Sequence, residues 1–225
     1  MSVWAVLVAA GRGERFGGDR PKAFARLGGR PLLAESLERL EASERIDAIV
    51  VVAPAGWEEP SILLAEELGA GKVSACVTGG ASRTASVRIG VAEVPEDTAA
   101  ILVHDAARPL VSDDVIERVL APLGERCDGA VPGLPVADTL KRTRDAVVLE
   151  TIDRAGLVAV QTPQAFVADV LRRALAGELR DATDCAGLVE AAGGRVCVVE
   201  GDPRLVKVTT AADLAFVENL LEARS

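Results

Sequence analysis

Apolar runs of β-strand character alternate with helical patterns along the first part of the chain. The apolar runs occupy residues 3–8, 47–53, 72–78, 99–104 and 129–134, and the helical patterns lie near 31–43, 57–69, 82–93 and 112–122. Strands that alternate with helices form a parallel sheet with helices on both faces. Ligands bind such a sheet beyond the carboxyl ends of its strands, so residues that follow separate strands meet at one edge. We therefore predict an α/β chain with a Rossmann-like, three-layer fold and a mostly parallel, twisted sheet.

The alternation then breaks, and residues 138–152 form two short β-prone stretches around the polar Arg144-Asp145. This pattern predicts a β-hairpin that extends from the main sheet. Residues 147–149 of the hairpin are apolar, and an exposed apolar hairpin needs cover that a partner subunit would provide. We therefore expect a protruding hairpin arm over residues 136–155 that makes a homodimer.

Helical patterns return near residues 167–176 and 184–192, and a last strand at 195–200 precedes a C-terminal helix at 210–223. The chain has no internal repeat, low-complexity tract or interdomain linker. A chain of 225 residues can bury a sizeable core. We predict a single domain over residues 1–225, with the arm inserted within it.

The composition argues against several classes of protein. Nucleic-acid binding is disfavoured for three reasons: the formal net charge is −9, aromatic residues are scarce and the sequence has no basic block. Cys76, Cys127, Cys185 and Cys197 have no metal-site spacing, so we expect them to be small core residues without a redox role. The N-terminus enters a strand directly and no apolar run could span a bilayer, so we expect a cytoplasmic protein.

The first strand opens into a loop that is suited to holding a polyphosphate. Its candidate residues are Ala9, Ala10, Gly11, Gly13, Arg15 and Lys22. Small residues let the backbone approach a ligand and point its amides at anionic oxygens, and Arg15 and Lys22 add positive charge. The loop lacks the third glycine of the dinucleotide fingerprint and the Gly-Lys-Ser/Thr of a P-loop. A glycine-rich turn with solvated charges remains the alternative for this loop alone.

Two further strand ends carry candidate residues. Gly79 and Gly80 could let backbone groups read a base edge, and Ser86 enters the next helix with a hydroxyl. Asp105 could accept hydrogen bonds from ribose hydroxyls or hold a hydrated Mg²⁺, and Arg108 could fork onto a phosphate. We assign His104, the only histidine, a structural role rather than that of a general base. If a phosphate monoester attacks another phosphate at this site, it is already ionised near neutral pH and needs little help from a base.

Polar residues also gather around the hairpin and before the last helix. They are Asp138-Thr139, Lys141, Arg154, the segment Gln161-Thr162-Pro163-Gln164, and Thr183-Asp184, which has the pattern of a helix cap. Lys207 closes the last strand. Only four of the 25 basic residues are lysines, so a retained lysine such as Lys22 or Lys207 suggests a need for a compact charge.

Taken in order, the motifs resemble those of the 2-C-methyl-D-erythritol 4-phosphate cytidylyltransferase family of nucleotidyltransferases. They read AAGRGERF, RPKAF, GGASRTASV, HDAARP, PVADTLKR, DR, QTPQAF, DATD and KVTT. The resemblance implies an enzyme of the non-mevalonate isoprenoid pathway with a nucleotidyltransferase fold. It would form 4-diphosphocytidyl-2-C-methyl-D-erythritol and pyrophosphate from CTP and the methylerythritol phosphate, using Mg²⁺. The reaction would be an in-line attack on the α-phosphate of CTP.

The resemblance also implies roles for individual residues. Those implied to bind CTP are Ala9, Ala10, Gly11, Gly13, Arg15, Lys22, Gly80, Ala81, Ser86, Asp105 and Ala106. Those implied to bind the acceptor are Arg108, Thr139, Arg154, Thr162 and Lys207. Of all these, Arg15, Lys22, Arg154 and Lys207 would be catalytic, and Asp105 is a candidate for holding the metal through water. In the family the arm reaches across a homodimer, so Thr139 and Arg154 would serve the neighbour's site.

Two positions depart from the family pattern. Leu205 stands where an asparagine is common, so another group must anchor the segment before Lys207. Ala81 stands where an acidic or small residue is common, so only its backbone can read the base. Three alternatives stay open at this point: a ribitol 5-phosphate cytidylyltransferase, another nucleotidyltransferase that activates a different sugar phosphate with a different nucleotide, and a non-catalytic nucleotide-binding subunit.

Overall fold

The computed structural model describes residues 1–11, 20–177 and 182–223. Their centre is an eight-stranded sheet in the order β10-β7-β11-β6-β1-β4-β5, in which β10 and β11 pair with different parts of β7 and β12 also pairs with β7. The strands are β1 (Val3–Val8), β4 (Ala48–Ala53), β5 (Val73–Thr78), β6 (Ala100–Asp105), β7 (Gly129–Pro135), β10 (Val158–Val160), β11 (Gln164–Val167) and β12 (Val196–Glu200). Only β10 and β11 run antiparallel to their neighbours, so the predicted mostly parallel sheet is confirmed.

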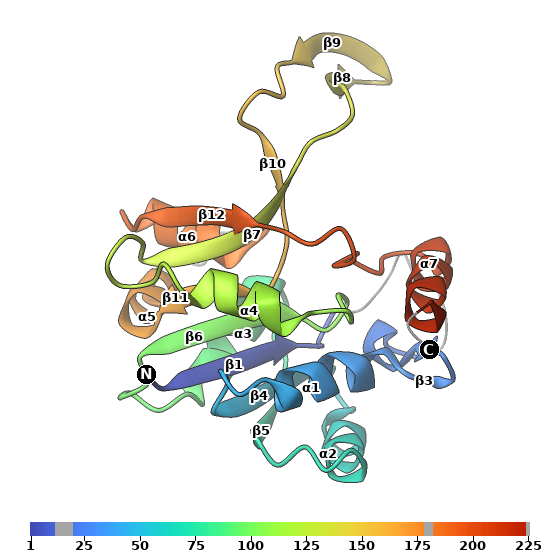
Figure 1. The fold of residues 1–225 in the computed structure, drawn as a ribbon, viewed down its shortest axis with the longest axis vertical. Helices are drawn as coiled ribbons and strands as arrows, with labels where there is room; N and C mark the ends of the chain where they lie inside the picture. Colours follow the sequence, from blue (N-terminus) through green and yellow to red (C-terminus); the bar gives the residue numbers. More distant parts are fainter. Residues whose placement is uncertain (12–19, 178–181, 224–225) are drawn as a thin grey trace.

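Helices cover both faces of this sheet because its strands alternate their side chains between two cores. Ala5 and Leu7 of β1 pack with α1 (Leu32–Ala42), α2 (Glu58–Glu67) and α4 (Asp113–Leu120). Val6, between them, packs with α3 (Arg83–Ala92), α5 (Ala168–Ala176) and α6 (Cys185–Ala191) on the opposite face. The three-layer α/β prediction is therefore confirmed (Figure 1).

A third, smaller core joins the C-terminal helix to the segment after the first loop. Val217 of α7 (Ala211–Glu222) is buried with Leu27 and Leu32. Leu27 belongs to a short hairpin, β2 (Arg26–Leu27) and β3 (Arg30–Pro31), which follows the 3-10 helix η1 (Lys22–Phe24). The start of α7 is fixed by a reciprocal cap in which Thr210 accepts from the Asp213 amide and Asp213 accepts from the Thr210 amide.

A hairpin of β8 (Leu140–Arg144) and β9 (Val147–Ile152) stands apart from the main sheet on two extended connections (Figure 1). Its turn lies at Asp145 and Ala146, whose φ angles are 50° and 63°, one residue later than predicted. Such paired positive φ angles belong to the two-residue turns that match the twist of hairpin strands. The strands of this arm are largely exposed.

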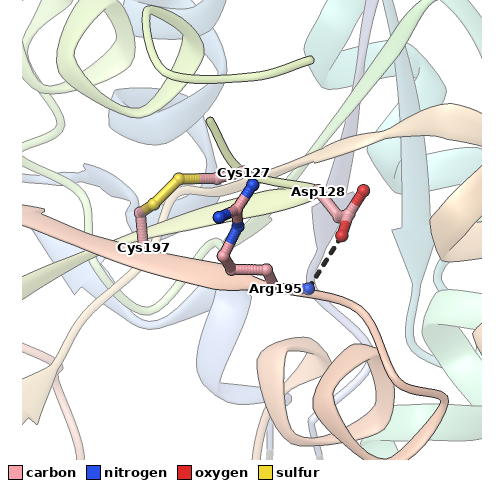
Figure 2. The surroundings of a disulfide bond; sticks show 4 residues. All are labelled: Cys127, Asp128, Arg195 and Cys197. Carbon is pink, nitrogen blue, oxygen red and sulfur yellow. Dashed lines mark hydrogen bonds between the residues drawn. A yellow bond between two sulfur atoms is a disulfide. The ribbon is translucent and has the colours of Figure 1, made fainter. Parts of the chain in front are cut away.

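The structure corrects two details of the sequence analysis. Cys127 and Cys197 form a disulfide, so the expectation that the cysteines are small core residues without a redox role was wrong for this pair (Figure 2). Lys207 lies in an irregular segment after β12, and the last strand ends at Glu200.

The disulfide joins two parts of the chain that become neighbours only through the sheet. Cys127 precedes β7, and Cys197 lies in β12, which pairs in parallel with β7 from Val196 onward. Next to the disulfide, the Arg195 amide donates to the Asp128 carboxylate over 2.8 Å (Figure 2). None of the helices in the described part of the chain has the length and apolar character needed to cross a membrane.

Candidate active site

A cavity of about 530 Å³ opens where β1, β5 and β6 end. Its walls come from the β1 loop, η1, the start of α3, the end of β6 and the segment before α7. The residues that line it are Val8, Ala9, Ala10, Gly11, Lys22, Ala23, Leu32, Gly80, Ala81, Ser82, Arg83, Ser86, Asp105, Ala106, Ala107, Lys207 and Thr209. Motifs that are nearly 200 residues apart in sequence, such as Ala9 and Lys207, thus meet at one sheet edge.

Close backbone packing shapes the cavity wall beside β1 and β5. A Cβ atom added to Gly79 would lie 2.1 Å from the Cβ of Ala10, so no larger residue fits there. The hydroxyl of Ser86 accepts from the Gly80 amide over 3.0 Å and donates to the Ser82 carbonyl over 2.9 Å. In this structure Ser86 therefore holds the glycine loop in shape.

Three charged side chains from distant segments meet in the cavity. Arg83 contacts Oδ1 of Asp105 through Nε at 3.0 Å and Nη2 at 2.8 Å. Lys207 Nζ contacts Oδ2 of the same carboxylate at 2.7 Å. Burial alone would raise the pKa of Asp105, but the charges of Arg83 and Lys207 outweigh it and hold that pKa well below its usual range. Asp105 is therefore an ionised, doubly paired carboxylate.

His104 is fully buried behind the cavity, as a structural histidine would be. Its Nε2 lies 3.0 Å from the Arg108 carbonyl, which can only accept, so Nε2 carries the proton. Nδ1 then accepts from the Thr162 hydroxyl, whose oxygen accepts from the Asp105 amide. Burial lowers the pKa of His104 to about 4. The imidazole is thus neutral and fully occupied by its neighbours.

The segment Gln161–Gln164 supports the cavity from behind. Gln161 makes two hydrogen bonds to the backbone of Asp202, on the segment that leads to Lys207. Gln164 holds the start of α6, donating to Asp184 and accepting from the Cys185 amide. Asp184 also caps α6 by accepting from the Gly187 amide, as its pattern predicts. The motif thus positions separate elements of the site.

The predicted site residues separate into three groups. Those lining the cavity are Ala9, Ala10, Gly11, Lys22, Gly80, Ala81, Ser86, Asp105, Ala106 and Lys207. Gly13 and Arg15 lie outside the described residues. Arg108, Thr139, Arg154 and Thr162 lie off the cavity wall.

The four residues off the wall have distinct surroundings. Thr162 is buried against His104. Arg108 Nη1 donates to the Leu205 carbonyl over 2.5 Å, so Arg108 supplies the anchor that the missing asparagine required. Thr139 and Arg154 are exposed in and beside the arm.

The sequence analysis did not select Arg83, although its segment was identified. Arg83 is the first residue of α3, where the helix dipole disfavours a cation, and the first turn of α3 contains no acidic residue. A cation in such a position indicates a carboxylate partner from elsewhere in the fold. That signal was available in the sequence. The identity of the carboxylate partner, Asp105, was not, because the pairing depends on the fold.

The described residues do not provide a carboxylate cage for a divalent cation. Among the described residues that line the cavity, Asp105 is the only acidic one, and both its oxygens are engaged by cations. No group of three or more His, Cys, Asp or Glu side chains suited to a metal ion occurs within residues 1–11, 20–177 and 182–223. The described part of the site therefore offers no set of carboxylates that would hold a Mg²⁺ ion by themselves.

Comparison with known proteins places the chain among cytidylyltransferases. The sequence model described as 2-C-methyl-D-erythritol 4-phosphate cytidylyltransferase matches residues 3–223. A protein of that name from Nocardia farcinica is 47% identical over 225 residues, covering 100% of this chain and 96% of the relative. Another from Saccharopolyspora erythraea is 45% identical, covering 98% of this chain and 100% of the relative.

Solved structures agree in fold over nearly the whole chain. A crystal structure of 4-diphosphocytidyl-2C-methyl-D-erythritol synthase superimposes with a TM-score of 0.84 at 33% identity, covering 98% of both chains. The 2-C-methyl-D-erythritol 4-phosphate cytidylyltransferase from Thermus thermophilus superimposes with a TM-score of 0.78 at 36% identity, covering 96% of this chain and 98% of that one.

Proposed function

The chain belongs to the 2-C-methyl-D-erythritol 4-phosphate cytidylyltransferase family, and we propose that the cavity at the ends of β1, β5 and β6 is where it performs the family's reaction. It is a nucleotidyltransferase that transfers CMP from CTP to 2-C-methyl-D-erythritol 4-phosphate and releases pyrophosphate. One observation carries the placement of the site: the glycine-rich strand ends and the retained lysines, Lys22 and Lys207, line one cavity.

The chemistry requires positioning and charge neutralisation. An acceptor phosphate oxygen attacks the α-phosphorus of CTP, a new P–O bond forms, and the bond to the pyrophosphate leaving group breaks. The small residues Ala9, Ala10 and Gly11 let the backbone approach the nucleotide phosphates. Lys22 and Arg15 would balance the charge that develops at the α-phosphorus. Gly80 and Ala81 would meet the base through backbone atoms, beside the loop that Ser86 fixes.

The acceptor would enter from the side of Lys207. This lysine reaches the cavity from the segment before α7 and lies against Asp105, next to the positions assigned to the nucleotide. Arg108 and Thr162 would support acceptor binding indirectly, through the Leu205 carbonyl and the Asp105 amide. His104 takes no proton in this scheme, since both its nitrogens are occupied.

The divalent cation of the reaction would be held chiefly by the nucleotide. A Mg²⁺ ion that binds substrate phosphates usually keeps several waters and needs only one or two protein carboxylates. Asp105 is already neutralised by Arg83 and Lys207, which agrees with a cation that arrives with CTP.

The arm supports an assembly of two copies. Val147, Val148 and Leu149 are 62%, 55% and 52% exposed, an apolar surface that a second subunit could cover. Arg154 and Thr139, which belong to the arm, lie off the cavity of their own chain. We propose a homodimer in which they reach the neighbour's cavity. We also propose a cytoplasmic location, the compartment that holds CTP.

Pyrophosphate release with CTP and Mg²⁺ tests the function. We expect release with 2-C-methyl-D-erythritol 4-phosphate and little with ribitol 5-phosphate. Release with ribitol 5-phosphate alone would keep the fold and mechanism but refute the acceptor. A protein that binds CTP and releases pyrophosphate with neither acceptor would refute the enzymatic assignment.

A further inference from the structure

Arg83 is a described residue of the cavity wall that has no assigned role but contacts both Asp105 and Cys185. Its guanidinium grips one oxygen of Asp105 with two nitrogens, and its remaining nitrogen Nη1 lies 3.5 Å from the sulfur of Cys185. Burial lowers the pKa of Arg83, but its attraction to Asp105 and its contact with Cys185 outweigh this and raise it above the usual value. Arg83 is therefore a permanent, fixed cation.

Lys207 is the more exposed partner of Asp105. Its side chain is 39% exposed, compared with 21% for Arg83 and 9% for Asp105. Lys207 makes one contact to Oδ2 with a single nitrogen, whereas Arg83 makes a forked contact to Oδ1. An ammonium on a flexible stem turns toward a new anion more readily than a guanidinium fixed on two sides.

The Arg83–Asp105 and Lys207–Asp105 ion pairs would respond differently when an anionic substrate enters. Two cations share one carboxylate, so the cluster keeps excess positive charge that attracts a phosphate. If Lys207 turns to that phosphate, Asp105 still has Arg83 as a one-to-one partner. Without Arg83, the Asp105 carboxylate and the phosphate would compete for one lysine. A buried carboxylate that loses its partners carries a large desolvation cost, so Asp105 would retain Lys207.

We propose that Arg83 is a positioning residue for the acceptor, acting through Asp105 to release Lys207 for the acceptor phosphate. The proposal rests on the proposed role of Lys207. The proposal also explains why Arg83, a cation, occupies the first position of α3 against the helix dipole. Its partner is the Asp105 carboxylate at the end of β6.

The test measures steady-state kinetics with the acceptor varied and CTP saturating for each protein. We expect Arg83→Gln to raise the KM for the acceptor about tenfold or more, with a KM for CTP that changes much less. Arg88→Gln removes the same charge from an exposed position of the same helix and should leave both values within about twofold.

A double variant separates this role from simple structural support. Adding Asp105→Asn to Arg83→Gln removes the competing carboxylate, so the KM for the acceptor should fall below that of the single variant. Arg83→Lys keeps the charge but offers one nitrogen in place of two, so it should raise the KM for the acceptor by less. Adding Asp105→Asn should lower that KM again. This variant decides the question if Arg83→Gln does not fold. An unchanged acceptor KM in the single variants, or a double variant no better than its parent, would overturn the proposal.

Direct binding distinguishes this proposal from the proposed reaction. If the wild-type protein releases no pyrophosphate, the reaction assignment fails, and binding of inorganic phosphate measured by ³¹P NMR then decides the role of Arg83. Weaker binding by Arg83→Gln that recovers in the double variant supports the proposal. Equal binding by all these proteins contradicts it.

Discussion

Lys22 stands in η1 on the cavity wall, in a chain where arginine supplies most of the positive charge. Removal of one preorganised charge at a reacting centre costs about 10²–10³ in rate. We therefore expect Lys22→Ala and Arg15→Ala each to lower kcat by about that factor, with unchanged thermal unfolding. Lys72→Ala, which removes a lysine that hydrogen-bonds the Ser43 carbonyl away from the cavity, serves as the control. Near-normal turnover of Lys22→Ala would remove it from the catalytic set.

His104 predicts a specific dependence of stability on pH. Its pKa is lowered from 6.5 to about 4 in the folded state, so the unfolded chain binds more protons between these values. The free energy of unfolding should fall as the pH drops from 6.5 to 4, by about 3 kcal/mol in total from this residue. Urea titrations at several pH values measure the fall. His104→Asn should be less stable at pH 7 and show a flatter dependence, and a wild-type curve that is level across this window would contradict the prediction.

Single residues also show what the sequence could and could not predict about the site. Asp105 could be selected because it follows an apolar run, and Lys207 because lysines are rare in this chain; both belong to recognisable motifs. Their pairing with each other and with Arg83 could not, because it depends on three segments meeting across the sheet edge. For the same reason, Thr162 could be predicted as a site residue, while its hydrogen bonds to Asp105 and His104 appear only in the fold.

At the scale of elements, local patterns predicted the order of strands and helices well because each is encoded within its own segment. The neighbour of a strand is not encoded locally. The disulfide was missed because Cys197 reaches Cys127 only when β12 pairs with β7, across a sequence separation of 70 residues. The irregular segment that carries Lys207 reads as apolar and β-prone, but tertiary hydrogen bonds such as that between the Val208 amide and the Ala107 carbonyl hold it outside the sheet.

The disulfide should stabilise the attachment of β12, since a crosslink that closes a loop of this length removes entropy from the unfolded chain. The chain-entropy relation gives about 4 kcal/mol for the 70-residue separation. We expect the double variant Cys127→Ser, Cys197→Ser to lose stability of that order in urea unfolding without reductant. Cys76→Ser, at a free cysteine, is the control. Equal stability of the double variant and the wild type would show that the crosslink contributes nothing.

At the scale of the whole molecule, the arm predicts that one active site contains residues from two chains. Lys22 lines the cavity of its own chain, whereas Arg154 lies off that cavity, beside the arm. If Arg154 serves the neighbour, a mixed dimer of Lys22→Ala and Arg154→Ala chains has one site with both defects and one site with neither. If Arg154 serves its own chain, each site of the mixed dimer carries one defect.

Mixing the two inactive variants after unfolding and refolding them together distinguishes these arrangements. Random pairing of subunits should restore about a quarter of wild-type turnover if the site is shared between chains. Each variant refolded alone is the baseline, and sedimentation shows whether dimers form. Val148→Asp, placed in the exposed apolar stretch of β9, should reduce both dimer formation and the recovery. Dimers that form without any recovery would place Arg154 in its own chain's site, and the arm would then serve assembly alone.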